Sequence, residues 1–197
     1  MKKPIIALLL AVVILFGASF GLNGIAAKNA QEAHLTMMKT LLPGAEEFTV
    51  EPYAGEDATI RSVHKADIGF VVETVTYGYA GEITMLIGVN NAGKVTGLVV
   101  QEAHETAGLG NQALTDHVFL SQFLNKTGTF AVATHGEVDA FSSATGDDAA
   151  AAEGETVDVD AITGATVTTK AVIRCVNSAV AYVTGADASS SATEWGG

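Results

Sequence analysis

Cysteine and positive charge are both scarce in this 197-residue chain. Cys175 is the only cysteine, so an intrachain disulfide is impossible, and its place in a helical pattern predicts a small buried apolar side chain. The sequence has no CxxC, HExxH or His-rich spacing, so we predict no metal site and no iron–sulfur cluster. Ten Lys and Arg against 22 Asp and Glu give a net charge of −12. That balance argues against a nucleic-acid partner and against binding flat on anionic lipid.

The longest uncharged stretch runs over residues 4–27 and is mostly aliphatic. About 24 helical residues at about 1.5 Å each reach about 36 Å, which exceeds a hydrocarbon core of about 30 Å. Lys2 and Lys3 ahead of the stretch predict an N-terminus on the cytoplasmic side. We therefore predict a cytoplasmic stub and one uncleaved transmembrane helix over residues 1–28 of a protein of the cell (inner or cytoplasmic) membrane. A cleaved signal peptide is the alternative, because two lysines before an apolar run are typical of it as well.

The rest of the chain is predicted to lie outside the cytoplasm, in three parts. Residues 29–54 form a stalk helix and linker, with helical spacing over 30–42. Residues 55–185 form one domain, and residues 186–197 form a disordered tail. Within the domain, residues 142–155 are small, acidic and low in complexity, which predicts a flexible surface insertion.

The domain sequence alternates β-rich runs with a few helical patterns and has no regular βαβ repeat. This order predicts an α+β domain with an antiparallel sheet. The turn residues 90–93 between two β-rich runs predict a hairpin. Strands are predicted over 58–64, 68–79, 82–89, 94–102, 130–134 and 157–162, and helices over 113–124 and 166–183. In the first helix the inward side chains are predicted to be Leu114, Val118, Phe119 and Phe123.

The segment from Asp160 to Thr169, DAITGATVTT, leads from an acidic turn through small residues into the last predicted helix. Thr163, Gly164 and Thr166 lie where the start of a helix presents free backbone N–H groups, which suits a phosphate. Hydroxyl and carboxylate side chains at such a place are also ordinary helix caps. The pattern alone leaves both interpretations open.

A second loop over residues 102–111 contains Gly108-Leu109-Gly110, preceded by Glu105 and Thr106. The two glycines let the backbone turn tightly and approach a ligand closely. Most such loops are plain turns, and His104 beside it is typical of a solvated histidine.

Together the two segments resemble the FMN-binding domain family. The matching patterns are His104-Glu105-Thr106-x-Gly108-Leu109-Gly110 and Asp160-x-x-Thr163-Gly164-Ala165-Thr166-x-x-Thr169, and the resemblance extends over about residues 75–183. The family includes the RnfG subunit of the ion-translocating ferredoxin:NAD oxidoreductase and the NqrC subunit of the sodium-pumping NADH:quinone oxidoreductase. The resemblance implies that a flavin transferase esterifies Thr166 with the phosphate of FMN.

The resemblance also implies roles for the neighbours of Thr166. Asp160 would serve recognition during transfer, and Gly164 and Ala165 would keep the chain slim. Thr163 and Thr169 would cap the helix or bond the phosphate. In the upstream loop, Glu105 and Thr106 would bond the isoalloxazine or ribityl chain, Gly108 would shape the turn, Leu109 would pack on the ring, and His104 would be marginal. Ala107 stands where the family usually has Pro, which loosens this loop.

The function implied is that of a membrane-anchored electron-transfer subunit with covalent FMN. Its partners would be the other membrane subunits of an Rnf-type ion-pumping complex, and the flavin transferase during maturation. No catalytic acid, base or nucleophile set accompanies the flavin site, so we expect no independent turnover by this chain. The compact length favours RnfG over NqrC. An NqrC-like subunit, a stand-alone extracytoplasmic flavin shuttle, and an anchored β-rich interaction domain without flavin are the alternatives.

Overall fold

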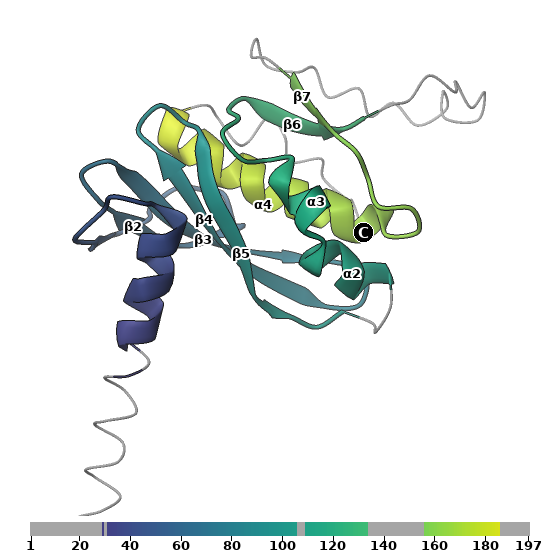
Figure 1. Cartoon of the computed structure of the whole chain (residues 1–197), viewed down its shortest axis with the longest axis horizontal. Coiled ribbons are helices and arrows are strands. Elements are labelled where there is room, and N and C mark those ends of the chain that lie inside the picture. Colours follow the sequence, from purple (N-terminus) through teal and green to yellow (C-terminus); the bar gives the residue numbers. More distant parts are fainter. Residues whose placement is uncertain (1–28, 30, 106–108, 134–155, 186–197) are drawn as a thin grey trace, which may run out of the picture. The chain divides into compact units, whose positions relative to one another are not determined.

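The computed structural model describes residues 29, 31–105, 109–133 and 156–185 (Figure 1). The predicted transmembrane segment 1–28, the acidic insertion 142–155 and the tail 186–197 lie outside these residues. Within the described part of the chain, no helix is both long and apolar enough to cross a membrane. The chain divides into two compact units, residues 1–37 and 38–197, and the second carries the fold described below.

Five antiparallel strands form one sheet in chain order. They are β1 (Thr49–Glu51), β2 (Ile60–Lys65), β3 (Gly69–Tyr77), β4 (Glu82–Asn90) and β5 (Val95–Ala103). The predicted α+β class and antiparallel sheet are thus confirmed. The β4–β5 turn is held by the Asn90 carboxamide, which accepts hydrogen bonds from the backbone N–H groups of Ala92 and Lys94 at 3.0 and 2.9 Å. Strand β1 was not predicted, because three largely exposed residues carry no periodic signal.

The long helix α4 (Thr166–Thr184) covers one face of the sheet (Figure 1). Its apolar side chains Val172 and Val176 are fully buried in the larger core cluster, together with Met85 and Ile87 of β4. This helix was predicted over 166–183. It ends at Gly185, whose φ of 70° is the left-handed value that favours glycine after a helix.

The other face of the sheet is covered by the end of the helix over residues 31–41 and the turn after it. Met38, Leu41 and Leu42 form a second buried cluster with Val71 and Leu86 of the sheet. Because both faces are covered, the seven residues inside β4 are all buried and show no alternation.

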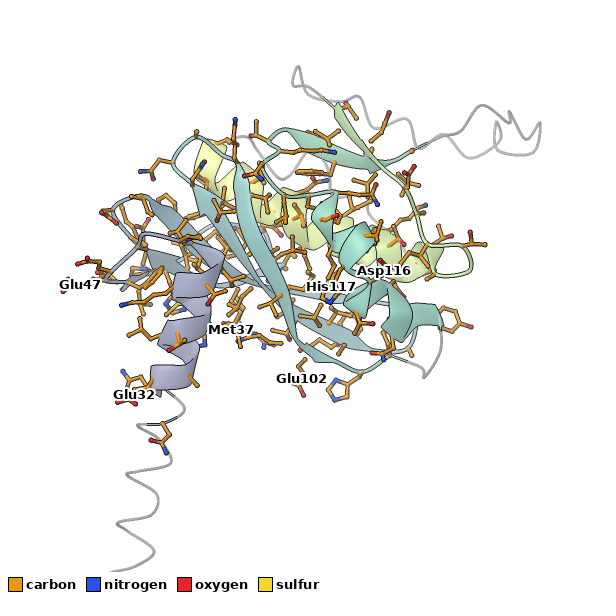
Figure 2. All side chains as sticks on the ribbon, viewed as in Figure 1. Glu32, Met37, Glu47, Glu102, Asp116 and His117 are labelled. Atoms are coloured by element: carbon orange, nitrogen blue, oxygen red, sulfur yellow. The ribbon has the colours of Figure 1, made fainter. Side chains whose placement is uncertain are left out.

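The helix predicted over 113–124 is in fact two short helices, α2 (Leu109–Thr115) and α3 (His117–Ser121). Asp116 breaks the chain and caps α3, since its carboxylate accepts hydrogen bonds from the backbone N–H groups of Val118 and Phe119 at 2.8 and 3.1 Å. Figure 2 labels Asp116 and His117 at this junction. The break changes which face is inward. Leu114, Phe119 and Phe123 are buried as predicted, but Val118 is 77% exposed, so that prediction was wrong.

Two further strands, β6 (Thr129–Val132) and β7 (Thr156–Val159), pair in parallel. A side chain of α4 supports this small sheet. The Asn177 carboxamide accepts from the backbone N–H of Phe130 at 2.9 Å and donates to its carbonyl oxygen at 3.0 Å, as a neighbouring strand would. The pairing positions β7, which leads directly to the start of α4.

Candidate functional site

A sharp elbow, residues 160–165, joins β7 to α4. Gly164 has a φ of 81°, which glycine adopts at little cost and other residues rarely adopt. The backbone N–H of Ala165 donates to the carbonyl oxygen of Ile162 at 2.9 Å and closes the turn. Helix α4 then begins at Thr166, as the sequence predicts.

The start of α4 is open at its surface. Its N-cap residue is Ala165, no side chain caps it among the described residues, and its first turn contains no acid. The predicted capping role of Thr163 is therefore wrong, and the exposed side chain of Thr163 lies on the turn before the helix. Thr166 is exposed on the first turn. Backbone N–H groups of a first turn have no partner within the helix, and the helix dipole adds positive potential there.

Thr169 faces the interior rather than this surface. Its side chain is fully buried, and its hydroxyl accepts a hydrogen bond from the backbone N–H of Ile162 at 3.4 Å. Its own N–H donates to the carbonyl oxygen of Ala165 at 2.8 Å. Thr169 thus stabilises the elbow from beneath, a position that does not favour the direct phosphate contact implied by the resemblance.

Asp160 at the other end of the elbow is held through its backbone. The Gln122 carboxamide accepts from the Asp160 N–H at 2.8 Å and donates to the Asp160 carbonyl oxygen at 3.2 Å. Gln122 is the C-cap residue of α3, so α3 fixes the start of the elbow. Sequence reasoning missed Gln122, because a glutamine 38 residues upstream carries no local signal of such a pairing.

Glu105 brings the two predicted loops together. Its Oε1 accepts a hydrogen bond from the hydroxyl of Thr168 in the first turn of α4 at 3.4 Å. The same carboxylate accepts from the backbone N–H groups of Tyr79 and Ala80 at 2.7 and 3.3 Å. The predicted contacts of Glu105 with a flavin ring are not tested by this arrangement, but protein groups already occupy both of its oxygens.

The other residues of the upstream loop are placed less fully. Thr106 and Gly108 lie outside the described residues, and Leu109 is described only as the first residue of α2. His104 directly follows β5, where its N–H donates to the carbonyl oxygen of Glu82. Its ring lies in solvent, 3.6 Å from a carboxylate oxygen of Glu102. That environment matches the solvated histidine expected from the sequence.

Two cations follow Thr166 along α4. Lys170 and Arg174 are exposed and lie four and eight residues after Thr166, on the same side of the helix. Cys175 beside them is buried, and burial raises the pKa of its thiol to about 11. The thiol therefore stays protonated and is a poor nucleophile, so it does not compete with Thr166 for an electrophile.

Comparison with known proteins places this site within a family pattern. The family model described as FMN-binding domain matches residues 78–181, more than half of the chain. The RnfG subunit of the proton-translocating ferredoxin:NAD(+) oxidoreductase complex of Clostridium ljungdahlii is 27% identical over 183 residues, covering 93% of this chain and 89% of the relative. The RnfG subunit of the ion-translocating oxidoreductase complex of Vibrio parahaemolyticus is 30% identical over 163 residues, covering 82% and 70%.

A third relative matches over a shorter region. The corresponding subunit of the Na(+)-translocating ferredoxin:NAD(+) oxidoreductase complex of Acetobacterium woodii is 33% identical over 115 residues, which cover 57% of this chain. The match spans about half of that relative's length, 48%. The region shared with all three relatives includes the domain that holds the elbow.

Proposed function

The chain belongs to the FMN-binding domain family, and on that premise we propose that it is the electron-transferring RnfG subunit of an ion-translocating ferredoxin:NAD oxidoreductase complex, with FMN linked through its phosphate to Thr166. The observation that carries the proposal is the exposed Thr166 hydroxyl on a helix start that no side chain caps within the described residues. A phosphate at that place would meet unpaired backbone N–H groups and the positive end of the helix dipole.

The residues of the elbow fit a phosphoester in size as well as in charge. Gly164 and Ala165 add little bulk ahead of Thr166, so another protein can reach the hydroxyl. The first turn contributes no carboxylate of its own that would repel the phosphate. Lys170, one turn further along the same side, adds a positive charge within reach of a long flexible side chain.

The attachment needs an activated phosphate, because a hydroxyl does not displace water from a free phosphate at useful rates. A suitable donor is flavin adenine dinucleotide, which carries FMN in a phosphoanhydride. The Thr166 oxygen would form a bond to the FMN phosphorus while the phosphoanhydride bond breaks. AMP would leave, and a base of the transferase would take the hydroxyl proton, so that no oxidant or reductant is consumed.

The attached flavin would supply the redox chemistry of this subunit, and the protein would hold and position it. We propose no independent turnover by this chain. Its partners would be the other membrane subunits of the complex and, during maturation, the flavin transferase. A covalent link makes particular sense outside the cytoplasm, where lost FMN is not readily replaced.

The domain plan of the proposal follows the sequence. Residues 1–28 would anchor the chain in the cell membrane with the N-terminus inside, and residues 29–54 would connect the anchor to the FMN domain over 55–185. The names of the relatives differ in the translocated ion, one naming sodium and one protons. We therefore propose that the choice of ion belongs to other subunits.

In-gel fluorescence tests the attachment directly. The full chain is expressed together with a flavin transferase, denatured, separated by electrophoresis and viewed under ultraviolet light. The wild type and Thr166→Ser should fluoresce, and Thr166→Ala should be dark. A fluorescent Thr166→Ala band with a dark Thr163→Ala band would move the attachment to Thr163. A dark wild type would exclude the covalent link and favour an interaction domain.

A further inference from the structure

Three segments far apart in sequence meet at the carboxylate of Glu105. The turn between β3 and β4 contributes the N–H groups of Tyr79 and Ala80, at 2.7 and 3.3 Å. Helix α4 contributes the hydroxyl of Thr168, at 3.4 Å. The start of α2 lies against the same group, because a Cβ on Gly110 would be 2.8 Å from Glu105 Oε2.

The fit around this carboxylate is tight. A Cβ on Gly78 would overlap Glu105 Oε1, so both segments that flank the carboxylate have glycine at the point of contact. Thr168 is 1% exposed, and its hydroxyl is 3.3 Å from the place that a Cβ on Gly110 would occupy. Such packing leaves Thr168 little freedom to rotate, so the hydrogen bond to Glu105 has a defined direction.

Glu105 also supplies the negative charge that the start of α4 lacks. Acids are favoured in the first turn of a helix, where they offset the positive end of the dipole, and a Glu at the third position commonly completes a capping box. In α4 the third position is Thr168, and the first turn has no acid. Its hydroxyl instead binds a carboxylate that comes from 63 residues earlier in the chain.

We infer that Glu105 is a positioning residue for flavin attachment, acting through Thr168 to fix the first turn of α4 and with it the direction of the Thr166 hydroxyl. The inference rests on the proposed attachment at Thr166. Displacement at phosphorus needs the attacking oxygen in line with the leaving group, so a small rotation of this turn reduces the rate of transfer strongly. Glu105 touches neither the phosphate nor the ring in this role.

The test measures flavin transfer to the purified full chain in detergent, with flavin adenine dinucleotide and a purified transferase. Initial rates over a range of chain concentrations give kcat and KM separately. The variants are Glu105→Ala, Thr168→Val and the double variant, with Thr168→Ser as the rescue. Glu102→Ala is the matched control, since Glu102 is an exposed glutamate three residues earlier.

Glu105→Ala and Thr168→Val should each lower kcat by roughly ten- to a hundredfold with little change in KM. Because the two residues act as one unit, the double variant should be no slower than the slower single variant. Thr168→Ser and Glu102→Ala should stay within about twofold of the wild type. Melting temperatures are measured in parallel, and Thr168→Val keeps the shape of the side chain if Glu105→Ala does not fold.

The outcomes separate this inference from the proposed attachment. An unlabelled wild type would overturn the attachment itself. A labelled wild type with an unchanged kcat in Thr168→Val would overturn the positioning role, even if its melting temperature fell. Losses that multiply in the double variant would show that Glu105 acts independently of Thr168, which would also overturn it.

Discussion

The side-chain carboxamide of Gln122 pairs with the backbone of Asp160 through two hydrogen bonds, of 2.8 and 3.2 Å. Asn177 pairs with the backbone of Phe130 in the same way, at 2.9 and 3.0 Å. Helices α3 and α4 thus each use an amide side chain to hold a non-helical segment. One of these segments opens the elbow, and the other belongs to the strand beside it.

Replacing Gln122 by alanine should loosen the elbow. The change removes both hydrogen bonds, at about 0.5–1.5 kcal/mol each, and leaves the Asp160 backbone groups to water. We expect a lower free energy of unfolding in urea and slower flavin attachment at Thr166. Gln101→Ala, an exposed glutamine on β5, is the control and should change neither quantity. Attachment at the wild-type rate in Gln122→Ala would show that the pairing serves stability alone.

Replacing Gly164 by alanine should affect both stability and attachment. The φ of 81° costs an alanine about 1 kcal/mol, and relief of that strain would rotate the elbow. Gly185→Ala is the matched control, because Gly185 has a φ of 70° at the opposite end of the same helix with nothing within 4 Å of an added Cβ. Both variants should lose similar stability in urea, but only Gly164→Ala should attach flavin more slowly. Equal attachment rates in the two variants would argue against a role of the elbow's shape.

The Tyr182–Glu51 hydrogen bond of 2.8 Å should make stability depend on pH in the alkaline range. Burial, followed by the bond to Glu51, raises the pKa of Tyr182 to about 12 from 10.0. A raised pKa of a folded acid means that its stabilising contribution is complete below about pH 10 and is lost as the pH rises through about 12. Tyr182→Phe should therefore lower the melting temperature at pH 8 and lose less stability than the wild type between pH 10 and 12. Parallel pH curves for the two proteins would contradict this assignment.

The same hydrogen bond acts at the acid end through Glu51. The Tyr182 hydroxyl, followed by the lesser effect of Lys65, lowers the pKa of Glu51 from 4.5. A lowered pKa means that the contribution is present above pH 4.5 and is lost as the pH falls through the folded value. Glu51→Gln should therefore lose less stability than the wild type on acidification below pH 4.5, measured as the urea midpoint. A difference between the two that stays constant with pH would exclude this linkage.

The thiol of Cys175 should be unreactive in the folded protein. It is fully buried, and burial raises its pKa to about 11, so both access and thiolate are lacking at pH 8. A coloured disulfide reagent should react slowly in buffer and at once in guanidinium chloride. Ser121→Cys introduces an exposed thiol and should react rapidly in the folded state. Equally fast reaction of the wild type in buffer would mean that α4 opens locally.

Local patterns in the sequence were sufficient for α4 and for the β4–β5 hairpin. The spacing of Val172, Val176 and Val183 has a helical period, and Asn90 to Gly93 have turn chemistry, so both signals lie within a few residues. The break at Asp116 was missed, since a capping residue inside a continuous apolar pattern is hard to distinguish from a solvated acid. The misplaced Val118 followed from that error.

The site was predictable only in part for the same reason. Thr166 at the start of a helix follows from a local motif. The contacts of Glu105 with Thr168 and of Gln122 with Asp160 join residues 63 and 38 positions apart, and only the folded chain brings them together. The buried position of Thr169 also depends on the tertiary fold, because a helix of small residues does not reveal which hydroxyl faces inward.

Helix α4 is secured near both ends, by Glu105 at Thr168 and by Glu51 at Tyr182. At about 1.5 Å per residue it extends about 28 Å and has its apolar face fixed on the sheet. Under the proposed attachment, Thr166 would then be a fixed pivot. The reach of the flavin ring would be set by the rotatable bonds between the Thr166 oxygen and the isoalloxazine, and the distance of an electron hop to a neighbouring subunit would vary only within that short radius.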